Sequence, residues 1–307
     1  MSTEGLDRKP GPPGALKGEA LRTAAEALAA EVQAKVRERQ GGVRTFFDNF
    51  LLRSLEELRR LGPGVAWEDS AARLPGPRGE RVRARLERLR RFLDRRSKGR
   101  FVDYHDRLPV LPEADPWPSD IDRPTLAMSQ GTAECLRWRG LPLFKTAFDF
   151  AVYPMLLWDL RPRTVVELGS GSGASAVWLA ELMALFGGGH VYSLDLKRPD
   201  VRHDAVTFLE GDCGEIETAL DAEFLRALPH PWLAIEDAHV NVHGVLAHLH
   251  AHLAPGDYLI VEDSLEKRAD IGRFLSERPG AYKVDTRYTD FFGRNATCAF
   301  DSIFVRN

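Results

Sequence analysis

Acidic residues end or closely follow five short apolar segments of the chain. Glu167, Asp195 and Asp212 belong to the first three of these segments, and Asp237 and Asp263 to the last two. A carboxylate at such a position can accept hydrogen bonds from ribose hydroxyls, or it can bind a hard divalent cation. The sequence therefore offers acids for two kinds of chemistry, which are nucleoside binding and metal binding.

A glycine-rich segment follows the first apolar segment and precedes a helical pattern. Its candidate binding residues are Gly169, Ser170, Gly171, Gly173 and Ser175. Glycines let the backbone turn tightly and approach a ligand at the N-terminus of a helix. The same string fits the G-x-G-x-x-A pattern of dinucleotide-binding loops, so the loop alone also permits NAD.

Two features favour S-adenosylmethionine over NAD at this loop. Glu167 immediately precedes the glycines, where its carboxylate can bind the amino group of a methionine moiety, and we expect no second NAD-type domain that would supply a hydride acceptor. We expect Asp195 to bind ribose hydroxyls and Asp212 to lie at the adenine edge. For each acid taken singly, a helix N-cap or a surface charge is the alternative.

The last two acidic segments each end in a Glu-Asp pair, Glu236-Asp237 and Glu262-Asp263. Crowded carboxylates repel one another unless they are protonated or neutralised, and a divalent ion with oxygen ligands, Mg²⁺ first, resolves that repulsion. Alternation along the strand is expected to turn Glu236 away from Asp237. His239, two residues past Asp237, can act as a general base at the edge of the metal.

The elements that position these residues alternate as βα units, which predicts a mostly parallel α/β sheet with its ligands at the carboxyl ends of the strands. Two further strands should pair antiparallel, because no helix is expected between them. The layout is that of the Rossmann-like class I methyltransferase fold with seven strands. The expected strands are 164–168, 190–195, 205–209, 232–236, 257–262, 281–289 and 297–305.

The first 139 residues differ in character from the rest. Residues 1–18, rich in Pro and Gly, are expected to be disordered, and residues 19–107 to form a helical extension that acts as a lid or a dimerisation element. Residues 108–139 are expected to be a linker or wrapping segment, and residues 140–307 the catalytic domain. Helical patterns cover residues 19–39, 45–61 and 81–96.

Composition limits the classes of protein. The net charge is −3, there is no run of 18 apolar residues, and the three cysteines lack a C-x-x-C spacing. We therefore expect no membrane span, no disulfide framework and a cytoplasmic location. Residues 78–100 carry eleven basic and three acidic residues. This strip could grip nucleic acid, but it lacks interleaved aromatic residues, so a solvated or substrate-facing helix is favoured.

Residues 140–307 resemble the cephalosporin hydroxylase-like and rhamnosyl O-methyltransferase family, metal-assisted class I methyltransferases that act on natural-product and sugar substrates. The resemblance implies that S-adenosylmethionine binds to Glu167 and the glycines, and that Asp237, Glu262 and Asp263 bind Mg²⁺ or another divalent cation. The family usually has one more residue between the aspartate and the histidine, which leaves open whether Glu236 or Asp237 is the ligand. The segments that carry the resemblance are GLPL, VVELGSGSGASA, FLEGD, LAIEDAH, LAPGDYLIVEDS and GRFLSERPG.

These observations predict an S-adenosylmethionine-dependent, Mg²⁺-assisted methyltransferase that acts on a hydroxyl of a small molecule. Asp237 and His239 are the expected catalytic residues, with His239 taking the proton of the acceptor. The alternatives are a nucleic-acid or protein methyltransferase that uses the Arg78–Arg100 strip, a non-catalytic cofactor-binding subunit, and an NAD-dependent oxidoreductase. The N-terminal helices would then cover the pocket or join two copies of the chain.

Overall fold

The computed structural model describes residues 18–39, 42–60, 76–107 and 117–307. The chain divides into two compact units, Met1–Gly99 and Arg100–Asn307, and each is described by itself. The tail expected to be disordered lies outside the described residues, apart from Gly18, and so do residues 108–116 of the expected linker. Among the described residues, no helix combines the length and the apolar content that a membrane span requires.

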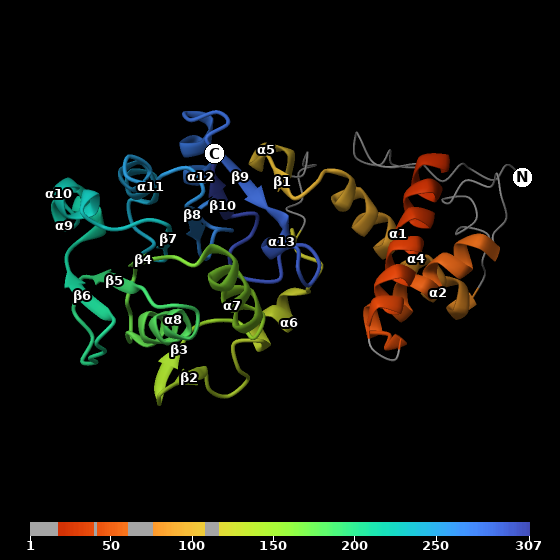
Figure 1. The fold of residues 1–307 in the computed structure, drawn as a ribbon, viewed down its shortest axis with the longest axis horizontal. Helices are drawn as coiled ribbons and strands as arrows, with labels where there is room; N and C mark the ends of the chain where they lie inside the picture. Colours follow the sequence, from red (N-terminus) through yellow and green to blue (C-terminus); the bar gives the residue numbers. More distant parts are fainter. Residues whose placement is uncertain (1–17, 40–41, 61–75, 108–116) are drawn as a thin grey trace, which may run out of the picture. The chain divides into compact units, whose positions relative to one another are not determined.

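The first unit packs three helices around one apolar cluster (Figure 1). They are α1 (Gly18–Glu38), α2 (Phe46–Arg60) and α4 (Gly76–Ser97), close to the three helical patterns of the sequence. Leucines at helical spacing, such as Leu51, Leu55 and Leu58, supply the buried face of each helix. Arginines of the basic strip also pair with acids inside this unit, for example Arg85 with Glu57 at 2.8 Å. Its predicted role as a lid or dimerisation element stays a prediction.

The second unit is built on one mostly parallel eight-stranded sheet. Strands β4 to β8 are parallel, β10 pairs antiparallel with both β8 and β9, and β1 adds an antiparallel edge strand to the seven that were predicted. In spatial order the strands are β1 (Phe101–Val102), β9 (Tyr282–Asp285), β10 (Ile303–Arg306), β8 (Tyr258–Val261), β7 (Trp232–Glu236), β4 (Thr164–Leu168), β5 (His190–Asp195) and β6 (Val206–Glu210).

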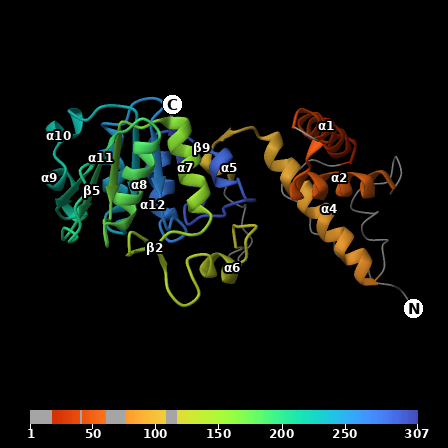
Figure 2. The ribbon, with the colours of Figure 1, turned by 60° about the horizontal axis from the view of Figure 1, so that its bottom comes forward.

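Helices cover both faces of this sheet (Figure 2). One apolar cluster contains residues of α7 (Asp149–Leu160) and α8 (Ala174–Leu185), and another contains residues of α11 (Val242–His250) and α12 (Arg268–Ser276). Successive residues of a central strand alternate between the two clusters, because side chains alternate along a strand. The shorter elements are α5 (Tyr104–Arg107), α6 (Arg123–Met128), η2 (Cys213–Glu215), α9 (Ile216–Ala219), α10 (Ala222–Arg226) and α13 (Thr286–Thr289).

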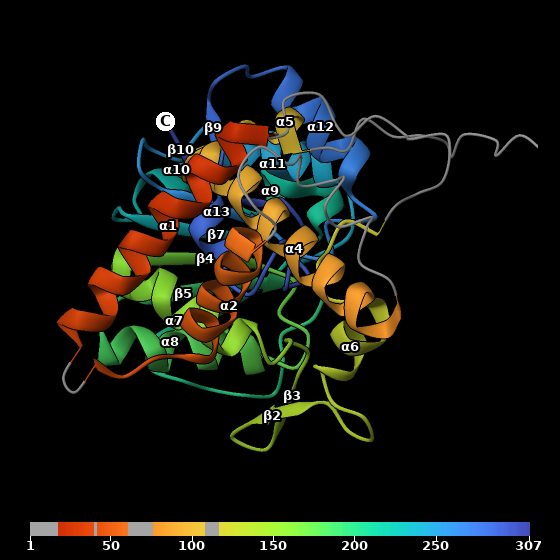
Figure 3. The ribbon, with the colours of Figure 1, turned by 90° about the vertical axis from the view of Figure 1, so that its right-hand side faces the viewer.

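A separate two-stranded hairpin, β2 (Leu136–Trp138) and β3 (Leu141–Leu143), precedes α7. Figure 3 shows it below the rest of the second unit. The Trp138 indole nitrogen donates to Glu181 of α8 at 2.6 Å, and this bond fixes the hairpin to the helix that follows the glycine-rich loop.

The predicted C-terminal hairpin pairs antiparallel as expected, but the expectation of no helix between its strands is wrong. Strand β9 ends at Asp285, whose side chain accepts a hydrogen bond from the Arg287 amide at 3.0 Å and caps α13. Strand β10 begins only at Ile303, because Asn295 and Asp301 adopt left-handed backbone conformations that interrupt an extended strand. A loop therefore separates the two strands.

A buried ion-pair network fastens this loop to the segment that enters the second unit. Arg107 binds Asp290 and Asp301, each at 2.7 Å, and all three side chains are almost fully buried. Arg294 binds the other oxygen of Asp301 at 2.7 Å. The Asn295 side chain donates to the Pro118 carbonyl at 3.0 Å, which brings the described part of the expected linker against the same loop.

Replacing Arg107 should therefore destabilise the protein strongly. Arg107→Gln leaves two buried carboxylates without their main partner, and we expect the free energy of unfolding to fall by about 3–5 kcal/mol. Arg60, which pairs with Glu56 on the exposed surface, is the control, and Arg60→Gln should cost less than about 0.5 kcal/mol. Chemical denaturation measures both values, and equal losses in the two variants would contradict the role of the network.

Candidate active site

A pocket of about 500 Å³ opens at the carboxyl ends of the parallel strands. Four of the segments that line it lie at the ends of the strands β4, β5, β6 and β7, residues 142–145 form a fifth, and Asp263 after β8 also contributes. This is the edge where open α/β sheets bind ligands, and the volume is in the range of small-molecule sites. The four segments are 169–172, 194–196, 211–213 and 237–240.

The glycine-rich loop requires its glycines for two different reasons. Gly169 has a φ of +101°, and a Cβ atom there would lie 2.6 Å from the Asp237 carbonyl oxygen. Gly173, the N-cap of α8, has a φ of +79°, and its Cβ would meet Val201 at 2.6 Å. These glycines thus bring the loop against its neighbours. Ser170, Gly171 and Ser175 line the pocket, and their contact with a cofactor stays a prediction.

Asp195 and Asp212 both line the pocket, and both also bind nearby backbone amides. Asp195 accepts from the Gly171 amide at 2.8 Å and from the Leu196 amide at 2.7 Å. Asp212 accepts from the Gly214 amide at 2.7 Å and so caps η2. The structure therefore shows Asp212 as a cap of η2 that also lines the pocket, and its contact with the adenine stays a prediction.

Glu167 lies beneath the loop and is not among the described residues that line the pocket. The Ser193 hydroxyl donates to its carboxylate at 2.5 Å and is itself 2.6 Å from the Ser170 hydroxyl. Burial raises the pKa of Glu167, against the lowering effect of Lys145 and the neighbouring hydroxyls. The carboxylate therefore supports the loop, and its contact with a ligand amino group stays a prediction.

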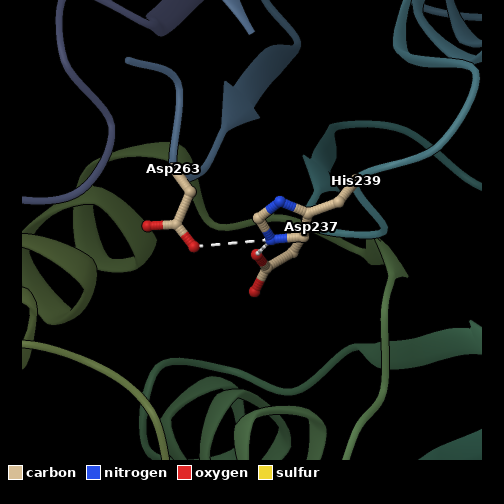
Figure 4. A group of neighbouring side chains, drawn as sticks. All are labelled: Asp237, His239 and Asp263. Atoms are coloured by element: carbon tan, nitrogen blue, oxygen red, sulfur yellow. Dashed lines mark ion pairs between the residues drawn. The ribbon is translucent and has the colours of Figure 1, made fainter. Parts of the chain in front are cut away.

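Asp237, His239 and Asp263 form a cluster that could hold a metal ion (Figure 4). Each side chain offers one ligand atom, and these three atoms lie within 4.8 Å of one another. The His239 Nε2 atom is 3.4 Å from an oxygen of Asp237 and 3.4 Å from an oxygen of Asp263. His239 and Asp263 both have positive φ, of 62° and 45°, so the loops after β7 and β8 carry backbone strain at this cluster.

Glu262, the remaining predicted metal ligand, lies beside this cluster: its carboxylate contacts that of Asp237, but it is not one of the three residues of the cluster. Its side chain is buried, and Lys145 and the Tyr153 hydroxyl bind its two oxygens. Strand alternation explains the difference: Glu262 continues the pleat of β8 towards α7, which carries Tyr153, whereas Asp263 lines the pocket. The assignment of Glu262 as a metal ligand stays a prediction.

Glu236 turns away from the pocket, as alternation predicted. It is fully buried, and one of its oxygens binds the Lys267 ammonium at 2.8 Å. Its other oxygen accepts from the amides of Ala238 and His239, each at 3.1 Å, and so holds the loop that carries His239. Of the two acids left open by the sequence, Asp237 is the one in the pocket.

Lys145 is a pocket residue that the sequence analysis missed. Its ammonium binds Glu262 and lies 3.3 Å from an oxygen of Asp237. Burial would raise the pKa of Asp237, but the charge of Lys145 and the bond from His239 outweigh it and lower that pKa below its usual range. The bond to Asp237 raises the pKa of His239. One signal was available, a lysine inside the otherwise apolar stretch that precedes α7.

The strand order, the glycine-rich loop at the start of α8 and the acids at successive strand ends define a class I methyltransferase, an enzyme that takes its methyl group from S-adenosylmethionine. A sequence profile described as Rhamnosyl O-methyltransferase/CmcI matches residues 130–280. The rhamnosyl O-methyltransferase of Mycobacterium leprae is 32% identical over 180 residues, which cover 51% of this chain and 77% of that protein.

Two further comparisons agree. The rhamnosyl O-methyltransferase of Mycobacterium tuberculosis H37Rv is 30% identical over 166 residues, covering 50% of this chain and 66% of that protein. A solved structure described as CmcI-N160 in its apo form is 27% identical, with a TM-score of 0.50, and the match covers 64% of this chain and 88% of that one. The chain belongs to the rhamnosyl O-methyltransferase/CmcI family and is an O-methyltransferase. Membership of this family excludes two of the alternatives left open by the sequence, an NAD-dependent oxidoreductase and a non-catalytic cofactor-binding subunit.

The close approach at Gly169 predicts the behaviour of one variant. In Gly169→Ala the new methyl group meets the Asp237 carbonyl, so the loop must shift away from the ligand. We expect the affinity for S-adenosylhomocysteine, measured by calorimetry, to fall by at least about tenfold. Gly272→Ala is the control, because that helical glycine has open space around it and an ordinary φ. Unchanged binding in Gly169→Ala would contradict this placement of the loop.

Proposed function

We propose that this chain transfers the methyl group of S-adenosylmethionine to a hydroxyl of a sugar or natural-product acceptor, with Mg²⁺ or another divalent cation beside the acceptor. The observation that carries the proposal is the position of the Asp237, His239 and Asp263 cluster, which opens into the same pocket as the glycine-rich loop. A methyl donor and a metal-oriented hydroxyl could therefore meet in one cavity.

The cofactor side of the pocket is formed by the glycine-rich loop with Asp195 and Asp212. Asp195 is half-buried next to Gly171, a position that suits hydrogen bonds from ribose hydroxyls. Asp212 follows β6 and lies where the adenine edge is expected. Glu167 lies beneath the loop and accepts a hydrogen bond from Ser193, whose hydroxyl is bonded to that of Ser170. This chain of hydrogen bonds supports the backbone that approaches the methionine moiety.

The metal side rests on the chemistry of its donors. Two carboxylates and one imidazole lie together, and carboxylate oxygens are the ligands that Mg²⁺ prefers. When bound, a divalent cation orients the acceptor and lowers the pKa of its hydroxyl. We assign Asp237 and Asp263 as its ligands, while Glu262, predicted as a third, is engaged by Lys145.

His239 is assigned as the group that takes the proton of the acceptor. Its Nε2 atom faces both carboxylates, and the amides of Ala238 and His239 are held by Glu236, so the imidazole has a fixed position at the pocket wall. A base placed within reach of the acceptor accelerates transfer because the neutral hydroxyl is a weak nucleophile. His239 is about half exposed, which leaves room for an acceptor.

The acceptor side also contains exposed apolar surface. Phe144 is 67% exposed and Val240 is 46% exposed, and both line the pocket near the acidic cluster. An apolar ring or the apolar face of a sugar could pack there, while its hydroxyls turn to Asp237 and Asp263. This arrangement supports a small-molecule acceptor.

Removal of the metal or of one ligand should stop methyl transfer. We expect EDTA to lower the rate at least about a hundredfold and added Mg²⁺ to restore it. Asp263→Asn should weaken Mn²⁺ binding at least about tenfold, since an amide is a poorer ligand than a carboxylate. Glu266→Gln, a change at an exposed acid three residues further on, is the control. A rate that is insensitive to EDTA would refute the metal part of the proposal.

His239→Ala separates the role of a base from that of a ligand. As the proton acceptor, His239 should contribute about a hundredfold or more to kcat, while the Kd for Mn²⁺ should change by less than about threefold. Rapid-quench methyl transfer and Mn²⁺ titration give the two values. A Kd that weakens in parallel with kcat would instead make His239 the third ligand.

A further inference from the structure

Lys145 brings a fixed positive charge into the acidic cluster. It lies between β3 and α7, its side chain is 5% exposed, and it is one of the residues that line the pocket. Its ammonium binds one oxygen of Glu262, whose other oxygen accepts from the Tyr153 hydroxyl. The same ammonium is 3.3 Å from Asp237.

The lysine therefore contacts two of the three acids that the sequence predicts as metal ligands. Its contact atom on Asp237 is Oδ2, whereas His239 faces Oδ1. A divalent cation drawn to Asp237 and Glu262 meets this ammonium at the same carboxylates, and two cations at such short range repel strongly in a partly buried site. Occupation of these oxygens by one cation lowers their affinity for the other.

We propose that Lys145 is a built-in cation that competes with the divalent ion for Asp237 and Glu262, and that this competition sets the metal affinity of the site. The inference rests on the metal site of the proposed function. In the metal-free enzyme the ammonium neutralises the buried acids, and a divalent ion that took Asp237 and Glu262 would have to displace the ammonium or share these oxygens with it.

A second buried pair in the same unit supplies the matched control. Lys267 and Glu236 are both almost fully buried and lie 2.8 Å apart, yet neither is among the described residues that line the pocket. Loss of either lysine leaves a buried glutamate without its cation, which costs stability. Only the loss of Lys145 also frees carboxylates that face the metal.

The test is a titration with Mn²⁺ alone, followed by electron paramagnetic resonance, at one fixed pH. We expect Lys145→Met to tighten the Kd for Mn²⁺ by about tenfold or more, and Lys267→Met to change it by less than about threefold. Without metal both variants should melt at lower temperature than the native chain. Saturating Mn²⁺ should restore the Tm of Lys145→Met much more than that of Lys267→Met, because the ion replaces the missing charge.

Two further variants keep the test decisive. Lys145→Arg retains the charge and should bind Mn²⁺ within about threefold of the native chain. In a Glu262→Gln background, Lys145→Met should give a smaller gain than in the native background, because only Asp237 is freed. If the single variant Lys145→Met does not fold, the comparison is made between Glu262→Gln and the double variant Glu262→Gln/Lys145→Met. The double variant is still expected to bind Mn²⁺ more tightly than Glu262→Gln.

The outcomes separate this inference from the proposed function. If neither the native chain nor Lys145→Met binds Mn²⁺, the proposed metal site is wrong. If the native chain binds Mn²⁺ and Lys145→Met binds it equally or more weakly, the site stands and the competition is wrong. If only Lys145→Met binds Mn²⁺ measurably, Lys145 suppresses metal binding, as the competition requires.

Discussion

The structure depends on how buried carboxylates are neutralised at one edge of the sheet. A carboxylate that leaves water loses hydration energy, and several carboxylates in one place also repel one another. Both Glu-Asp pairs meet this constraint in the same way. The glutamate is buried against a lysine, Lys267 for Glu236 and Lys145 for Glu262, and the aspartate faces the pocket. Each pair thus separates a structural acid from an acid available for chemistry.

The backbone couples the cofactor loop to the metal loops. The Asp237 amide donates to the Leu168 carbonyl at 2.8 Å, and the Glu262 amide donates to the Glu236 carbonyl at 2.9 Å. The hydrogen bonds between neighbouring strands therefore continue past the ends of the strands. Gly169 permits the same approach because any side chain there would strike the Asp237 carbonyl. A displacement of the glycine-rich loop would consequently move Asp237, so this loop and the acidic cluster are positioned by one edge of the sheet.

The sequence predicted the parts of this site that follow from local pattern. Apolar segments of strand length, a glycine string and an acid at each strand end were sufficient for the parallel sheet, the cofactor loop and the acids of the pocket. The alternation of side chains along a strand correctly predicted that Glu236 points away from Asp237. The same rule separates Glu262 from Asp263 along the strand, and the assignment of both as metal ligands, which the family resemblance implied, stays a prediction.

Long-range partners could not be predicted in the same way. Lys145 precedes Glu262 by 117 positions, and Arg107 precedes Asp301 by 194, so no local spacing connects them. The short helix α13 was not predicted for a different reason. Its N-cap residue, Asp285, lies inside a segment whose β-rich pattern predicts one continuous strand. Periodicity thus identifies elements and faces, whereas ion pairs between distant segments appear only once the fold brings them together.

The separation of each Glu-Asp pair also bears on the reaction. A divalent ion that took only Asp237 and Asp263 as protein ligands would keep most of its coordination positions for water and for the acceptor. Binding Glu262 as well would anchor the ion more firmly but would leave less room for acceptor oxygens. Lys145 and Tyr153 hold Glu262 on the α7 side, so the same contacts that stabilise the fold also keep the site open towards the pocket. A metal held by these two aspartates alone would favour exchange of acceptors over tight retention of the ion.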